Sequence, residues 1–153
     1  MKTELTKEQS QHLIDLGVPK EKASGVVITI PPTENGIRRR TRGIQQSIFK
    51  FTDLLEILPK EIEIPVFYDD LEEPEYYTKY RIAFEWDSSN FTEIEPQYNA
   101  FYKEIAFVSG GYLAKFSSEE LIDALYELTC WYYGEFLKSE KSKGKCTTSS
   151  IKN

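Results

Sequence analysis

The hydrophobic positions in the middle of the chain follow a period of two. Between residues 61 and 66, and again between residues 79 and 86, a large apolar side chain occurs at every second position. These positions are Ile62, Ile64, Val66, Tyr80, Ile82, Phe84 and Trp86. The alternation predicts half-buried β-strands with one face against a core. Pro65 lies in the first run and predicts an edge strand, because proline has no N–H to donate to a neighbouring strand.

The last third of the chain changes to a helical period. From residue 117 to about residue 138, apolar side chains recur three and four residues apart, which is typical of a helix with one buried face. The residues on that face are Leu121, Ile122, Leu125, Leu128, Thr129, Tyr132 and Phe136. Ser117 and Glu120 have the spacing of a capping box, so Ser117 is the predicted N-cap.

A strand-to-helix junction occurs twice. "FKFTDLLEILPK", residues 49–60, and "AKFSSEELIDALYEL", residues 114–128, both contain Lys-Phe, a hydroxyl residue, an acid and then leucines. In each we expect a strand that ends on a buried Phe and a helix capped by the hydroxyl, which is Thr52 in the first case. We expect the leucines of both helices to fold back over the same sheet. Pro59 limits the first helix to about two turns, because the residue before proline avoids helical geometry.

Shorter signals predict the remaining elements. In residues 6–24, Thr6 and Gln9 form a capping box for a first helix, Gly17 ends it, and Pro19 begins a second helix. The β-branched run at residues 26–30 predicts a strand. Gly110 and Gly111, which lie between two strand patterns, predict a hairpin.

The expected fold class is therefore α+β. We expect an antiparallel sheet of about four or five strands, a long C-terminal helix packed on one face, and an N-terminal helical pair. Residues 1–138 should form a single domain, with the helical pair in residues 1–24. Residues 139–153 are polar and predict a mobile tail.

Composition and charge restrict the setting and the partners. The net charge of −6 repels nucleic acid and anionic membranes unless basic residues gather locally. Cys130 and Cys146 do not form a disulfide framework, which favours a reducing, cytoplasmic setting. Since no apolar run approaches the length of about eighteen residues that a membrane span needs, we expect no membrane partner.

The single histidine restricts the chemistry. His12 lies on a predicted surface helix, neither cysteine is near it in sequence, and the three residues match no zinc spacing. The acidic loop at residues 69–75 lacks the alternating carboxylates and turn glycine of a calcium loop, and no phosphate-binding glycine motif occurs. We therefore expect no catalytic, cofactor-binding or metal residues, no cofactor, and a non-enzymatic binding or regulatory protein. An enzyme that uses carboxylates and tyrosines is one alternative.

Two features suggest how a partner is bound. The segment "IRRRTR" carries four arginines, Arg38, Arg39, Arg40 and Arg42. Guanidinium groups suit phosphate or carboxylate, so this segment suits a nucleic acid, an acidic protein partner, or internal pairing with the acidic loop 69–75. The net charge favours a protein partner, and a nucleic-acid-binding accessory protein is the other alternative. Trp131, at the margin of the helical apolar face, is a candidate interface anchor.

Three stretches also carry a resemblance. "HLIDLGVPKEKAS", "FTDLLEILPKEI" and "FSSEELIDALYELTCWYY" resemble a family of small uncharacterised proteins from gut Bacteroidetes, their mobile elements and their phages. The resemblance covers most of the chain apart from the tail and the arginine segment. It implies an intracellular protein of bacterial or phage origin, and it implies no activity and no functional residues.

Overall fold

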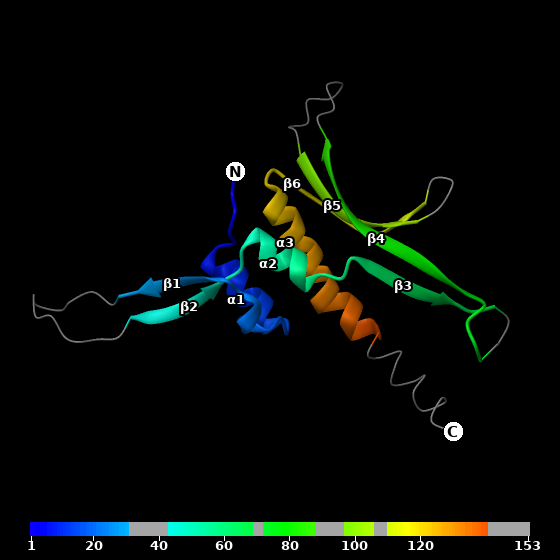
Figure 1. Ribbon diagram of the computed structural model, residues 1–153, viewed down its shortest axis with the longest axis horizontal. Coiled ribbons are helices and arrows are strands. Elements are labelled where there is room, and N and C mark those ends of the chain that lie inside the picture. Colours follow the sequence, from blue (N-terminus) through cyan, green and yellow to red (C-terminus); the bar gives the residue numbers. More distant parts are fainter. Residues whose placement is uncertain (31–42, 69–71, 88–96, 106–109, 141–153) are drawn as a thin grey trace, which may run out of the picture.

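The structure has the predicted α+β class. The computed structural model describes residues 1–30, 43–68, 72–87, 97–105 and 110–140. Along these residues the α-helices are α1 (Lys7–Asp15), α2 (Phe51–Ile57) and α3 (Leu121–Trp131). The strands are β1 (Gly25–Thr29), β2 (Ile44–Ile48), β3 (Glu61–Val66), β4 (Tyr76–Asp87), β5 (Gln97–Glu104) and β6 (Tyr112–Ser118) (Figure 1).

The strands form two antiparallel sheets. The larger one has four strands in the order β3-β4-β5-β6, and β1 and β2 form a separate two-stranded ribbon. The ribbon projects from the body at the end opposite the β3–β4 hairpin (Figure 1). The strand of the first junction therefore does not join the larger sheet, and the expectation of one shared sheet is wrong. The chain after β2 pairs instead with the N-terminal segment, since Leu5 N–H donates to Phe49 O over 2.9 Å.

The larger sheet separates apolar from charged side chains, as its alternation predicts. Ile62 lies opposite Tyr80, and Ile82 lies opposite Tyr102, so these four side chains share one face. They pack on the core, and α3 contacts β5 and β6. The edge position of the strand that contains Pro65 is confirmed, since β3 is the outermost strand in this order.

The N-terminal region contains one α-helix and one short turn. The predicted capping box of α1 is confirmed, because Thr6 Oγ1 accepts from Gln9 N and Gln9 Oε1 accepts from Thr6 N. Gly17 has a φ of 110°, a left-handed conformation that favours glycine and ends the helix. The expected second helix is a single 3₁₀ turn, Lys20–Lys22, and Pro19 immediately precedes it.

The N-cap of helix α2 lies two residues before the predicted one. Its N-cap is Lys50 and not Thr52, which is the second helical residue. The carboxylate of Asp53 lies over this first turn and accepts three hydrogen bonds on Oδ2. The donors are Ser24 N at 2.9 Å, Ser24 Oγ at 2.8 Å and Lys50 N at 2.8 Å. Asp53 thus performs the capping expected of Thr52 and also joins α2 to the start of β1.

Helix α3, in contrast, begins later than predicted. Ser117 is still part of β6, and the N-cap is Glu120. The Ser117 hydroxyl donates to the Asn99 side chain on the opposite strand, so it does not cap the helix. The buried helix residues Ile122, Leu125, Leu128 and Thr129 belong to the predicted apolar face. After Trp131 the helix widens into a π-helical turn, Tyr132–Phe136, and α-helix resumes at residues 137–140.

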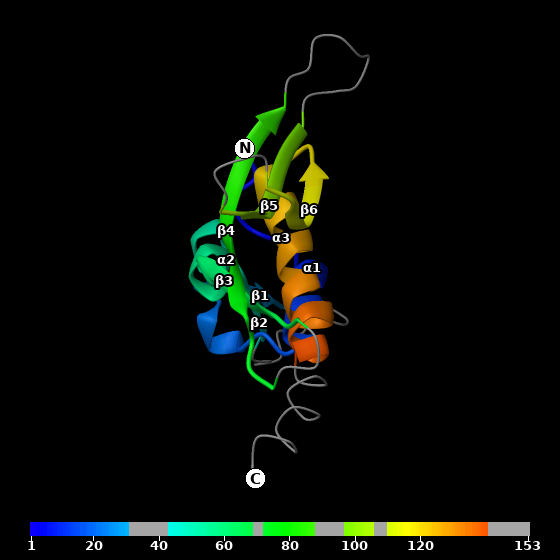
Figure 2. The same cartoon turned by 90° about the vertical axis from the view of Figure 1, so that its right-hand side faces the viewer.

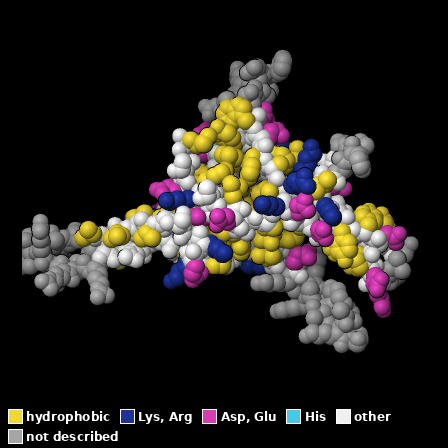
Figure 3. All heavy atoms as spheres, viewed as in Figure 1, with side chains coloured by type: hydrophobic (Ala, Val, Ile, Leu, Met, Phe, Trp, Pro, Cys, Tyr) yellow, Lys and Arg dark blue, Asp and Glu magenta, His cyan; other side chains and the backbone are white. Residues whose placement is uncertain are grey.

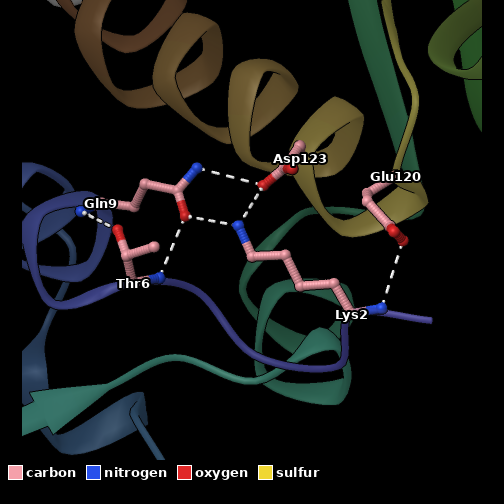
Figure 4. A network of polar contacts seen from close by, with 5 residues as sticks. All are labelled: Lys2, Thr6, Gln9, Glu120 and Asp123. Carbon is pink, nitrogen blue, oxygen red and sulfur yellow. Dashed lines mark hydrogen bonds and ion pairs between the residues drawn. The ribbon is translucent and has the colours of Figure 1, made fainter.

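The N-terminal segment connects the two largest helices (Figure 4). Lys2 Nζ donates to Asp123 Oδ1 on α3 over 2.7 Å and to Gln9 Oε1 on α1 over 3.1 Å. The Gln9 amide also donates to Asp123 Oδ1, and the backbone N–H of Lys2 donates to the Glu120 carboxylate. Both side chains of the Lys2–Asp123 ion pair are less than one-third exposed, with values of 28% and 27%. Partial burial reduces solvent screening, so this pair stabilises the fold more than a fully exposed one would.

Candidate protein-binding groove

A groove lies between α2 and one edge of β4. Strand β3 pairs with β4 only from the Val66–Tyr76 pair to the Glu61–Arg81 pair, whereas β4 continues to Asp87. The chain enters β3 from α2 through a turn at Pro59, so the residues before Lys60 do not continue along β4. Among the described residues, no strand therefore pairs with this edge of β4 beyond Ile82. Figure 2 shows α2 on this side of β4, with β5 and β6 on the other side.

The floor of the groove is apolar. Leu55 of α2 and Ile82 of β4 form this apolar part of the lining. The charged residues Lys60, Glu61 and Arg81 line the rest of the groove, whose volume is about 680 Å³. One helical turn before Leu55, the ring of Phe51 lies 6.4 Å from the ring of Phe84 on β4. Both Phe51 and Leu55 are only partly buried. Helix α2 thus presents Leu55 where β3 stops pairing with β4, and Phe51 beside Phe84, where β4 has no described strand on this side.

Exposed aromatic rings extend the apolar surface beyond the floor. Phe84 is 38% exposed and Trp86 is 50% exposed, although both belong to the inner face of the sheet by register. Trp86 packs on Tyr98 of β5 with ring centroids 4.3 Å apart. Large aromatic side chains that stay half in water are enriched at protein interfaces. Figure 3 shows hydrophobic side chains over the larger sheet and also along the projecting β1–β2 ribbon.

The backbone of the free edge is directed into the groove. Ile82 N–H donates to Lys60 O over 3.0 Å, so Ile82 points its backbone groups toward β3. On the opposite side, Lys79 O accepts from Ile105 N over 2.9 Å. Because backbone direction alternates along a strand that has two neighbours, Phe84 and Trp86 direct their N–H and C=O groups to the same side as Ile82. Such groups readily pair with an extended chain.

The charges along the groove differ from one end to the other. Lys60 stands at the end where the chain turns into α2, and its side chain is exposed. Beside it Arg81 Nη2 pairs with Glu61 Oε1 over 2.9 Å. Toward the other end, exposed Glu85 lies on the outer face of β4, between Phe84 and Trp86. We call the end at Lys60, where the chain turns through Pro59, the closed end of the groove, and the end toward Asp87 the open end. A cation therefore lies at the closed end and an anion lies toward the open end.

A buried tyrosine fixes the closed end of the groove. Tyr102, on β5, is fully buried, and its hydroxyl donates to Pro59 O over 2.6 Å. Burial raises the pKa of this hydroxyl far above its usual value, so the group keeps its proton at neutral pH. The hydrogen bond ties the corner between α2 and β3 to the centre of the larger sheet.

The predicted partner-binding residues lie elsewhere. Arg38, Arg39, Arg40 and Arg42 fall in residues 31–42, outside the described residues. Trp131 is partly buried, as its marginal position on the helix suggests. Its ring packs 5.3 Å from Phe136 and 6.0 Å from Tyr102, so one side of it belongs to the core. A role for Trp131 as an interface anchor stays a prediction.

The structure brings His12 and Cys130 to one surface depression, which their distance in sequence did not predict. The depression has a volume of about 270 Å³, and Glu127 and Trp131 also line it. Burial raises the pKa of the Cys130 thiol to about 11, and the nearby Glu127 carboxylate acts in the same direction. The thiol is therefore protonated at neutral pH, unlike the activated thiolate of a Cys–His nucleophile.

A second depression contains two carboxylates. It lies between α1 and β2, has a volume of about 430 Å³, and is lined by His12, Glu8 and Asp15 among others. Glu8 and Asp15 are two helical turns apart, or about 10 Å along the axis, so their positions do not converge on one reacting atom. Across the described ranges, no group of three His, Cys, Asp or Glu side chains is placed to hold a metal ion. No helix in these ranges is both long and apolar enough to cross a membrane.

Sequence reasoning missed the groove, although part of its signal was present. The alternating run at residues 79–86 predicted Phe84 and Trp86 on an inward face. The partner run at residues 61–66 is shorter, so the two runs cannot pair over their whole lengths. This mismatch in length indicates an unpaired edge. The sequence does not show that α2 lies beneath that edge.

No family model, curated protein or solved structure matches this chain.

Proposed function

We propose that the protein is a non-enzymatic binding or regulatory module that holds a segment of a protein partner in the groove between α2 and β4. One observation carries the proposal: a groove of about 680 Å³, with Leu55 and Ile82 in its lining, lies where β3 stops pairing with β4, and no other described strand pairs with the edge of β4 beyond it. Extended peptides commonly bind by adding to such an edge while their side chains fill neighbouring pockets. The resemblance and the composition support a bacterial or phage origin and a cytoplasmic location for this module.

A peptide selection tests this function. We would select random linear peptides against the wild-type protein, with one library displayed with free carboxyl termini and another displayed internally. Leu55→Lys places a charge on the apolar floor, and Thr52→Lys places the same charge on an exposed position of the same helix. We expect the selected peptides to bind wild type and Thr52→Lys alike. Binding to Leu55→Lys should be at least about tenfold weaker, because a lysine there disrupts the apolar contact.

Two results would overturn the proposal. One is that neither library yields peptides that bind above background. The other is that the bound peptides are indifferent to Leu55→Lys. Thermal unfolding of both variants identifies any loss of binding that reflects loss of the fold.

A nucleic-acid contact through Arg38, Arg39, Arg40 and Arg42 is the second candidate. The strands that flank this segment, β1 and β2, form the ribbon that projects away from the β3–β4 hairpin, whose connection carries the acidic loop (Figure 1). This arrangement separates the strands that flank the arginine segment from the hairpin that carries the acidic loop, and the candidate rests on that separation. Retention of generic DNA or RNA at low salt should weaken steeply with added salt and vanish when all four arginines are replaced by alanine. Unchanged retention in that variant would dismiss this candidate.

A further inference from the structure

We propose that the groove receives the C-terminal end of a partner chain, bound as an added antiparallel strand along β4. This inference rests on the proposed protein-binding function and adds the binding mode and the chemistry of the bound segment. It follows from four features of the groove: the backbone direction of its edge, its closed end, its charges and its apolar floor.

The edge dictates the hydrogen bonds. Phe84 and Trp86 direct their backbone groups into the groove, whereas Ala83 and Glu85 direct theirs toward β5. An antiparallel segment can therefore exchange two hydrogen bonds with Phe84 and two with Trp86. The residues of the segment that face these two positions must supply both an N–H and a C=O. The residues between them direct their backbone away from the sheet, into solvent.

The closed end dictates where the segment stops. All strands of the larger sheet are antiparallel to their neighbours, so an added strand follows the same direction as β3 and runs toward Lys60. The position opposite Ile82 is already occupied, because Lys60 O accepts from Ile82 N. A partner chain in the groove can face residues 83–86 and must then end or turn sharply away. A chain terminus meets this limit without a turn.

The charge at the closed end favours a carboxylate there. Lys60 is exposed, and within the described ranges it makes no ion pair, whereas the neighbouring Arg81 is already paired with Glu61. The last residue of an antiparallel segment, opposite Ala83, would bring its terminal carboxylate to the Lys60 ammonium. An ionised donor and acceptor form stronger hydrogen bonds than neutral groups do.

The two faces of the sheet at this edge determine which side chains the bound segment should carry. The second-last and fourth-last residues, opposite Phe84 and Trp86, direct their side chains to the inner face, over Phe51 and Leu55. These residues should be apolar. The third-last residue lies opposite Glu85 on the outer face and should be basic, because opposite charges on directly facing positions stabilise a strand pair. The net charge of −6 favours the same choice.

A second copy of this chain is a poor occupant. In a symmetric pairing of two β4 edges that leaves Lys60 in place, Glu85 faces either Glu85 or Asp87 of the second copy. Acids that face each other directly destabilise an antiparallel pair. Charged side chains on an edge strand are a common protection against self-association. The occupant is therefore a different chain, with the basic and apolar pattern described above.

Synthetic peptides test the binding mode. The probes are short fluorescent peptides with free carboxyl termini, Val, Ile, Leu or Phe at the second-last and fourth-last positions, and Lys at the third-last position. Fluorescence polarisation measures their affinity for the wild-type protein. We expect N-methylation of the second-last or fourth-last amide to weaken binding by at least about tenfold, since it removes a hydrogen bond to β4. N-methylation of the third-last amide, which faces solvent, should have little effect.

Two charge changes complete the test. Amidation of the terminal carboxylate should weaken binding to wild type about tenfold, but not binding to Lys60→Gln, which has already lost the cation. Glu85→Lys should reverse the preference at the third-last position from Lys to Glu. Neither substituted side chain is buried, so both variants should fold.

The inference fails if binding responds equally to N-methylation at all positions, or if amidation affects wild type and Lys60→Gln alike. It also fails if only internally displayed peptides bind in a manner that depends on Leu55, although the proposed function then stands. If no peptide of either kind binds in that manner, both the function and the inference fail.

Discussion

The replacement of Asp53 by alanine should be among the most destabilising single changes in α2. The Asp53 side chain is only 5% exposed, and its Oδ2 accepts from Ser24 N, Ser24 Oγ and Lys50 N. A hydrogen bond to an ionised group contributes about 1.5–3 kcal/mol, and a donor left without a partner in a buried site costs about 1–3 kcal/mol. The three bonds share one oxygen, so their contributions do not add in full. We expect a loss of about 3 kcal/mol in the free energy of unfolding.

Urea denaturation followed by circular dichroism measures this loss. With an m-value of about 2 kcal/mol per molar for a domain of this size, a loss of about 3 kcal/mol lowers the midpoint by about 1.5 M. Asp53→Asn keeps an acceptor oxygen but loses the charge, and should lose about half as much. Ser24→Ala removes one of the three donors and should cost about 1 kcal/mol.

The matched control is Glu56→Ala, which removes a carboxylate from an exposed position of the same helix. We expect this variant to change stability by less than about 0.5 kcal/mol, as is usual for surface positions. If Asp53→Ala and Glu56→Ala lower the midpoint equally, the capping role assigned to Asp53 is wrong. Equal losses for Asp53→Asn and Asp53→Ala would show that the charge and not the geometry matters.

Four further predictions concern other parts of the fold. Tyr102→Phe should lower the free energy of unfolding by about 1–2 kcal/mol, because Pro59 O loses its donor; a change below about 0.3 kcal/mol in urea denaturation would contradict this. In a Cys146→Ser background, Cys130 should react with iodoacetamide at pH 8 roughly a hundredfold more slowly in the folded protein than in the unfolded protein. The reason is that its pKa of about 11 in the folded protein leaves little thiolate. Equal reaction rates would show that the fold does not suppress ionisation of this thiol. For the same reason the unfolded thiol ionises first, so its contribution to folding stability should be present below about pH 9 and decrease between about pH 9 and 11. Asp123→Ala should cost about 1 kcal/mol, and less of this cost should remain in 1 M salt; the same cost at both salt concentrations would exclude an ionic contribution.

The elements with strong local signals could be predicted from the sequence. The alternating run at residues 61–66 became β3, and Thr6 with Gln9 became the capping box of α1, because each signal depends on residues only a few positions apart. The class of the fold followed from the same signals. These patterns report on the geometry of one element and its immediate surroundings, where local physical chemistry decides the outcome.

The wrong caps had a tertiary cause. Ser117 has the spacing of a capping residue, but Asn99 on the neighbouring strand takes its hydroxyl, and β6 continues through it. In α2, Asp53 and not Thr52 caps the first turn, and the Asp53 carboxylate also accepts hydrogen bonds from Ser24 on another segment. For Ser117 the hydrogen-bond partner is far away in sequence. For Asp53, two of the three donors belong to Ser24, 29 positions away, while the third, Lys50 N, is local. A local pattern contains no information about such a partner.

The groove could be predicted only in part, for a similar reason. The sequence shows that Phe84 and Trp86 share a face, but their exposure depends on where β3 stops pairing and where α2 lies. The turn at Pro59 sets both, and a buried hydrogen bond from Tyr102 holds that turn in place. This binding surface exists because part of β4 has no neighbouring strand on one side among the described residues. Such a surface can be recognised only when all the strand pairings are known.

The contact between the N-terminal segment and α3 also sets the time at which the chain can fold during synthesis. The Lys2 amide meets Glu120 across 118 positions of sequence, and the Lys2 ammonium meets Asp123 across 121. At about 5–20 residues per second, a ribosome needs on the order of 10 s to make the chain between these contacts. During that interval α1 lacks the helix that its Gln9 side chain will contact. A newly made chain should therefore remain sensitive to proteases until α3 has left the ribosome, and then become resistant in a single late step.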